Sequence, residues 1–66
     1  MRIQVNGQWQ EHAAALSVAE LLGALAMDDR RVAVELNLRI LPRANYRQTV
    51  LGDQDRLEIV TLVGGG

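Results

Sequence analysis

Apolar and polar residues alternate with a period of two in three stretches of the chain, a pattern that predicts strands with one buried face. We therefore expect strands at residues 1–5, 32–36 and 57–63. In the last of these, Glu58, Val60 and Leu62 would lie on the face opposite the core. The residues expected on the core side are Met1, Ile3 and Val5, then Val32, Val34 and Leu36, and finally Leu57, Ile59 and Thr61.

A tight hairpin is predicted after the first strand. Asn6-Gly7 suits a type I′ turn, in which both central residues need a positive φ. The returning strand, residues 8–12, is polar, so we place it at an edge of the sheet with Trp9 covering the margin. His12, the only histidine, is interpreted as a solvated side chain, because a lone histidine on a polar strand more often lacks a chemical role than has one.

One helix is predicted at about residues 18–26. Ser17 and Glu20 have the spacing of a capping box, and Leu16 and Leu21 stand at the two positions of a hydrophobic staple. A helix this short is marginal alone, so packing on a sheet must supply its stability.

The remaining segments are shorter. The charged residues 28–31 are interpreted as a solvated loop, and residues 39–41 as a short strand that Pro42 ends. We expect irregular structure with one helical turn over residues 42–48, in which Tyr46 packs inward. Residues 51–55 are expected to form a turn before the last strand.

This order of elements predicts an α+β fold, with one main helix across one face of a mixed sheet of four to five strands. If the first and last strands are neighbours in the middle, the topology is the ubiquitin-like β-grasp. We expect residues 1–63 to form this domain and residues 64–66 to form a flexible tail of three glycines.

Composition narrows the possible functions. The chain has 66 residues, no cysteine, seven basic residues that are all arginine, and a net charge of −1. A thiolate metal site, a cysteine nucleophile and a lysine Schiff base are therefore excluded, and the charge gives no electrostatic case for a nucleic-acid partner. The order of apolar and small residues does not match an export signal, and no stretch is long enough for a membrane span, so we expect a cytoplasmic location and no membrane partner.

The glycine tail and the order of the elements resemble the ThiS family of sulfur carrier proteins, which act in thiamine biosynthesis. The resemblance covers the whole chain. One departure is the turn before the last strand, where the family usually has Asp-Gly-Asp and this chain has Asp53-Gln54-Asp55. The segments that carry the resemblance are Asn6-Gly7, Ser17-Val18-Ala19-Glu20-Leu21-Leu22, Val34-Glu35-Leu36-Asn37, Ile40-Leu41-Pro42-Arg43, Arg56-Leu57-Glu58-Ile59-Val60 and Val63-Gly64-Gly65-Gly66.

The resemblance implies a protein substrate and carrier, not an enzyme. An E1-like activating enzyme of the ThiF type would adenylate the Gly66 carboxylate with ATP and Mg²⁺, which the partner uses and this chain does not bind. Sulfur from a donor such as a cysteine desulfurase system would then give a thiocarboxylate, and thiazole synthase (ThiG type) would accept that sulfur. Gly64 and Gly65 would let the carboxylate enter a narrow channel, because glycine adds no side chain where two backbones approach closely.

A docking surface is predicted beside the tail. Val60 and Leu62 lie on the uncovered side of the last strand, so with Glu58 and Val63 they are expected to contact a partner. Three alternatives stay open: a molybdopterin-synthase small subunit, a ubiquitin-like modifier, and a non-covalent β-grasp binding module whose tail has no chemical role.

Overall fold

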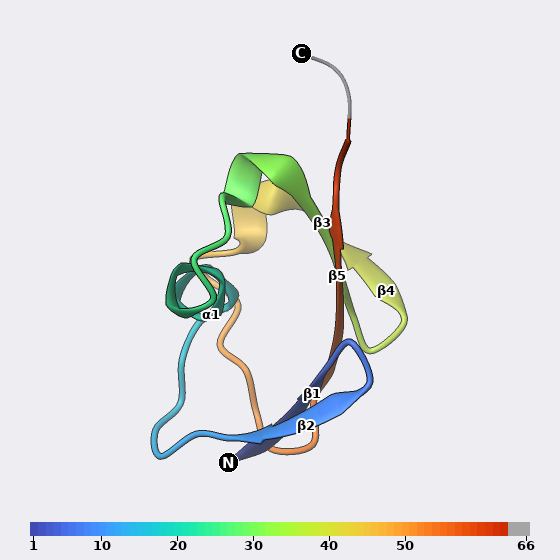
Figure 1. Ribbon diagram of the computed structural model, residues 1–66. Coiled ribbons are helices and arrows are strands. Elements are labelled where there is room, and N and C mark those ends of the chain that lie inside the picture. The colour runs from blue at the N-terminus through green and yellow to red at the C-terminus, as the bar shows by residue number, and fades with distance from the viewer. Residues whose placement is uncertain (64–66) are drawn as a thin grey trace.

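A computed structural model describes residues 1–63 of the chain. Within these residues, five strands form one sheet in the order β2-β1-β5-β3-β4, and one α-helix lies across one face of it (Figure 1). The predicted tail, residues 64–66, lies outside the described residues. The elements are β1 Arg2–Val5, β2 Gln8–Glu11, α1 Val18–Ala24, the 3-10 helix η1 Asp29–Arg31, β3 Val32–Leu36, β4 Arg39–Leu41, the 3-10 helix η2 Arg43–Asn45, and β5 Arg56–Thr61.

The first and last strands are neighbours in the middle of the sheet. β1 runs parallel to β5, while the β1–β2, β3–β4 and β3–β5 pairs are antiparallel. Gln4 and Val5 pair with Arg56 and Leu57, which brings the two ends of the described chain into one ladder. The predicted β-grasp topology is therefore confirmed.

Two hairpins of the sheet turn through left-handed residues. Asn6 and Gly7 have φ values of 50° and 82°, as the type I′ prediction requires. The β3–β4 turn places Asn37 and Leu38 at φ values of 52° and 70°. A leucine there is strained, because a side chain with a Cβ disfavours this region.

The predicted capping box is present at the start of α1. The Ser17 hydroxyl accepts from the Glu20 N–H at 3.0 Å, and the Ser17 N–H donates to the Glu20 carboxylate at 2.8 Å. The predicted end at residue 26 is wrong, since α1 ends at Ala24. Ala26 has φ 57°, and its N–H and that of Met27 turn back to the Gly23 and Leu22 carbonyls, which closes the helix in a Schellman motif.

The core lies between α1 and the sheet and is almost entirely aliphatic. Tyr46 packs inward from the residue after η2, as predicted. Burial raises the pKa of its hydroxyl above the ordinary value. The buried side chains are Ile3, Val5, Val18, Leu21, Leu22, Val32, Val34, Tyr46, Leu51, Leu57 and Ile59.

Three expectations about this core and its borders need correction. Leu51, placed in a turn by the sequence, is a core residue. Thr61 alternates with Ile59 but lies beyond the core and is exposed. Residues 28–31 are solvent-exposed as predicted, but they are not a loop, because Asp28 accepts a hydrogen bond from the Arg30 N–H and so caps the short helix η1.

The turn before β5 forms without a glycine at its left-handed position. Gln54 has φ 73°, and its N–H donates to the Arg2 carbonyl. The Asp55 side chain closes the same turn by accepting from the Gly52 N–H at 2.8 Å. In the part of the chain that the structure describes, no helix is long and apolar enough to cross a membrane.

Candidate functional site

The candidate site is the end of β5 and the open face of the sheet beside it. Val63, the last described residue, is 92% exposed. Val60 and Leu62 are 56% and 54% exposed, whereas Leu57 and Ile59 on the other side of the strand are buried. The predicted division of this strand into a core side and an open side is therefore confirmed for Leu57, Ile59, Val60 and Leu62 but not for Thr61, which is exposed. The predicted docking role of the open side stays a prediction.

One side of the β5 end is held by η1. The Leu62 N–H donates to the Arg31 carbonyl at 2.7 Å, one residue beyond β5. This bond extends the β3–β5 ladder by one residue and attaches the end of the last strand to η1.

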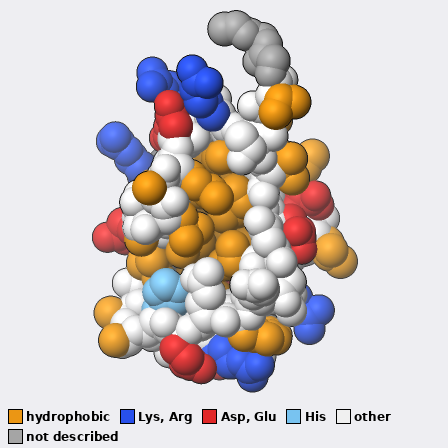
Figure 2. Space-filling view, in the orientation of Figure 1, with side chains coloured by type: hydrophobic (Ala, Val, Ile, Leu, Met, Phe, Trp, Pro, Cys, Tyr) orange, Lys and Arg blue, Asp and Glu red, His pale blue; other side chains and the backbone are white. Residues whose placement is uncertain are grey.

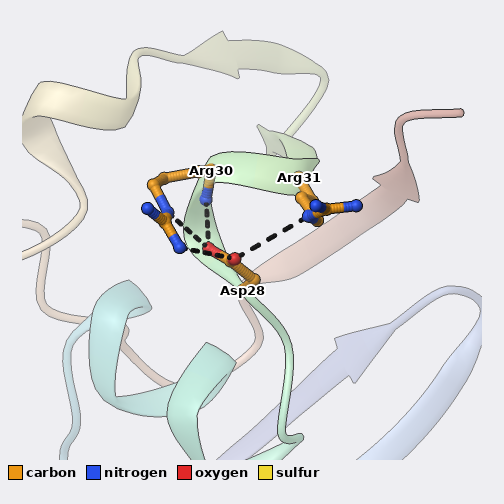
Figure 3. A network of polar contacts seen from close by, with 3 residues as sticks. All are labelled: Asp28, Arg30 and Arg31. Carbon is orange, nitrogen blue, oxygen red and sulfur yellow. Dashed lines mark hydrogen bonds and ion pairs between the residues drawn. The ribbon is translucent and has the colours of Figure 1, made fainter. Parts of the chain in front are cut away.

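Charge–charge contacts organise η1 itself (Figure 3). The Arg30 guanidinium donates to both Asp28 oxygens, at 3.2 and 3.1 Å, and the Arg31 Nε lies 3.9 Å from Oδ2. The hydrogen bonds from the Arg30 side chain lower the pKa of Asp28 from its ordinary value of 3.8 to about 2. Asp28 is therefore ionised at every physiological pH.

The other side of β5 is held by Asn6. Its side-chain oxygen accepts from the Ile59 N–H at 2.7 Å, and its amide nitrogen donates to the Ile59 carbonyl at 3.1 Å. The carboxamide thus takes the place of a further β1 residue in the ladder. Sequence reasoning missed this role, because the two partners are 53 positions apart and no local pattern connects them.

The open face holds more residues than the sequence-based prediction named. Ala33 pairs directly with Val60, and Glu35 stands between Glu58 on β5 and Ile40 on β4. Ile40 is 81% exposed. Directly paired residues of antiparallel strands project to the same face, so these side chains adjoin the predicted docking residues. The alternation of residues 32–36 could have placed Ala33 and Glu35 on the open face, but their position beside Val60 and Glu58 depends on the β3–β5 register.

The far end of the open face carries a cation–π contact. The Arg2 guanidinium lies 4.1 Å from the centre of the ring of Trp9, a residue of the edge strand β2. His12, beyond β2, contacts Gln10 at 3.1 Å. Within residues 1–63, no three histidine or acidic side chains come together as a ligand set for a metal.

Comparison with known proteins identifies relatives along the whole chain. The model of the ThiS family matches residues 3–66. The sulfur carrier protein ThiS of Escherichia coli is 32% identical, and the match covers 100% of both chains. A crystal structure of ThiS from Geobacter metallireducens has 36% identity and a TM-score of 0.86, again over 100% of both chains.

A longer protein is also similar. A thiazole synthase of Paramagnetospirillum magneticum is 46% identical over 66 residues, which is 100% of this chain and 20% of that protein. The chain thus spans about a fifth of the length of that relative.

Proposed function

The chain belongs to the ThiS family, and we propose that it carries sulfur for thiamine biosynthesis as a thiocarboxylate on Gly66. The match with a ThiS sulfur carrier, which covers 100% of both sequences, carries this proposal. The β-grasp domain would present the tail, and the partner enzymes would supply the catalytic groups. On this proposal the chain is a protein substrate.

The chemistry requires a carboxylate that can be activated. A terminal α-carboxyl is anionic at neutral pH and can attack the α-phosphorus of ATP, which releases pyrophosphate and forms an acyl adenylate. A sulfur nucleophile then displaces AMP and leaves a thiocarboxylate. We assign ATP, Mg²⁺ and the catalytic residues to a ThiF-type activating enzyme, and the sulfur to a cysteine desulfurase system, because this chain has no cysteine.

We assign the acceptor role to thiazole synthase. A relative with this name includes a segment 46% identical to the whole of this chain, and a covalent link between two domains favours their contact by raising the effective concentration of each. The sulfur on Gly66 would be consumed there in forming the thiazole ring.

The open face is proposed as the docking surface for the activating enzyme. Val60 and Leu62 form apolar surface next to the point where the tail begins, and Glu58 adds charge beside them. Exposed apolar surface adjoining a reactive group is typical of an interface. Docking here would fix the position of the tail, which matters because a misplacement of about 1 Å can cost about 10²-fold in rate.

Intact-mass measurement tests the proposal. After incubation with ATP, Mg²⁺, the activating enzyme and a sulfur source, we expect a mass gain equal to the exchange of one oxygen for sulfur, located in the C-terminal peptide. A chain that stays unmodified, or is modified elsewhere, would contradict the proposal. A stable adduct with another protein's lysine would instead indicate a ubiquitin-like modifier.

Extension of the chain is the matching control. A residue added after Gly66 converts the carboxylate into an amide, so ATP–pyrophosphate exchange should disappear while the thermal melt stays the same. A tag before Met1 should leave the exchange intact. Exchange at the wild-type rate with the extended chain would exclude the Gly66 carboxylate as the reacting group.

A further inference from the structure

The two edges of β5 differ near its end. In an antiparallel ladder, successive residues direct their backbone N–H and C=O groups to alternate sides. The Leu62 N–H donates to Arg31 on the β3 side, so Val60 and Glu58 share that side. Thr61, like Ile59 and Leu57, therefore directs its backbone groups toward β1.

On this side, β1 is the neighbouring strand, and it ends before it reaches the level of Thr61. The Leu57 carbonyl accepts from the Asn6 N–H at 2.9 Å, and both backbone groups of Ile59 bond to the Asn6 side chain. At Asn6-Gly7 the chain then turns back into β2. Within residues 1–63, neither the N–H nor the C=O of Thr61 has a hydrogen-bond partner on this side.

Apolar surface adjoins the same edge. Figure 2 shows a band of apolar side chains between the helix side and the sheet side of the molecule, above the β1–β2 hairpin and beside the upper half of β5. A sixth strand at this position would pair with Thr61 and cover part of that band. The edge thus presents unpaired backbone groups of Thr61 next to apolar side chains at the border of the core, an arrangement that strand addition can use.

We propose that this edge is a strand-addition site, at which an extended segment of thiazole synthase pairs with Thr61 when the tail enters that enzyme. The inference rests on the proposed function. Thiazole synthase is the chosen occupant because a relative has this domain and the synthase in one chain. The pairing would hold the root of the tail in line with the site that receives it, since β5 leads directly into residues 62 and 63.

Amide hydrogen exchange tests the pairing directly. In the free chain, the Thr61 N–H should exchange faster than those of Val60 and Leu62, which face β3. In the complex with thiazole synthase, exchange at Thr61 should slow by about tenfold or more, corresponding to about 1.4 kcal/mol. Unchanged exchange at Thr61 in a fully formed complex would overturn the proposal. Protection that develops in the free chain with rising concentration would assign the edge to a second copy, and would also overturn it.

A pair of variants provides a second test. Thr61→Pro removes the N–H on the open edge and leaves the β3–β5 hydrogen bonds intact, and proline is tolerated at such edge positions. Thr61→Val keeps the N–H and the branched shape. We expect affinity for thiazole synthase to fall about tenfold in the proline variant and to stay near wild type in the valine variant. If the proline variant fails to fold, the exchange measurement on the wild-type chain decides.

The outcomes separate this inference from the proposed function. Mass gain at Gly66 together with thiazole synthase binding that is insensitive to Thr61→Pro would leave the carrier role standing and refute the edge pairing. A loss of ATP–pyrophosphate exchange in the proline variant, with synthase binding intact, would assign the edge to the activating enzyme and equally refute the pairing. A wild-type chain that binds no thiazole synthase would contradict both.

Discussion

Glu35 and Glu58 stand directly opposite each other across the β3–β5 ladder, on the face of the sheet that the helix does not cover. Both are exposed, and in residues 1–63 neither forms a salt bridge. Like charges at directly paired positions destabilise a sheet. Repulsion between the two carboxylates therefore lowers the stability of the free domain slightly, next to Val60. A cationic group of a partner could remove this repulsion.

Glu58→Gln should separate stability from recognition. Relief of the repulsion should raise the free energy of unfolding by about 0.2–1 kcal/mol in urea denaturation. The same variant should bind the activating enzyme more weakly if a cationic group of that enzyme faces Glu58, because that group would lose its carboxylate partner. Glu35→Gln is the matched variant for the stability effect. A lower stability for either variant would contradict the repulsion, and unchanged affinity would remove Glu58 from the docking surface.

Val60→Asp tests the apolar part of the docking surface. The side chain is exposed, so the variant should fold, while affinity for the activating enzyme should fall at least about tenfold because a charge enters an apolar contact. Val50, also on the surface at 63% exposure, is the matched control, and Val50→Asp should bind like wild type. Equal affinities of the two folded variants would refute the docking role of Val60.

Leu57→Ala should lower the stability of the domain and leave its affinity for the activating enzyme unchanged. Leu57 is only 1% exposed and packs in the core, on the side of β5 opposite the open face. Truncation of a buried leucine to alanine typically costs about 2–5 kcal/mol. Urea denaturation should detect this loss, and at temperatures where the variant is folded its affinity should be near wild type. A loss below about 1 kcal/mol would be inconsistent with the packing described.

The sequence predicts the elements well where one local pattern determines them. The alternation in residues 1–5 and 57–63 identified Ile3, Leu57 and Ile59 as core residues, and the capping box located the start of α1. Each signal comes from neighbouring residues. The end of α1 was missed because it depends on Ala26 in a left-handed conformation, which alanine does not usually adopt.

The candidate site is less visible in the sequence, because long-range pairing builds it. Val60 and Leu62 follow from alternation alone, but their neighbours Ala33 and Glu35 require the β3–β5 register. The end of the β1–β5 ladder depends on the Asn6 side chain, a contact across 53 positions. An unpaired edge at Thr61 is therefore a property of the fold and has no sequence motif of its own.

The turn before β5 offers a stabilising substitution. Gln54 occupies the left-handed region at φ 73°, while Gly52 does not require it and has space for a Cβ. Gln54→Gly should raise the free energy of unfolding by about 0.5–1 kcal/mol through relief of backbone strain. Gly52→Ala should also be neutral or stabilising, because it restricts the unfolded chain at a compatible position. Thermal denaturation of both variants checks this, and a destabilised Gln54→Gly would show that Gln54 is held there by contacts stronger than the strain.

Asp28 predicts a pH dependence at the root of the tail. Its pKa in the folded chain is about 2, below the ordinary 3.8, so the carboxylate contributes stability that is present above about pH 4 and is lost as the pH falls through about 2. An NMR titration of the Asp28 carboxyl carbon should have its midpoint near 2. Arg30→Gln should move the midpoint up toward 3.8, since the Arg30 side chain is the main cause of the shift.

Arg31→Gln is the control, and it should move the midpoint much less, because Arg31 Nε is 3.9 Å from the carboxylate and makes only a weak charge interaction. The Leu62 amide provides an independent reporter. Its N–H bonds to the Arg31 carbonyl at the end of η1, so protonation of the residue that caps η1 should shift the Leu62 amide resonance with the same midpoint. A Leu62 resonance that stays constant while Asp28 titrates would mean that η1 does not transmit the state of its cap to β5. A wild-type Asp28 midpoint near 3.8 would contradict the contacts of Figure 3 themselves.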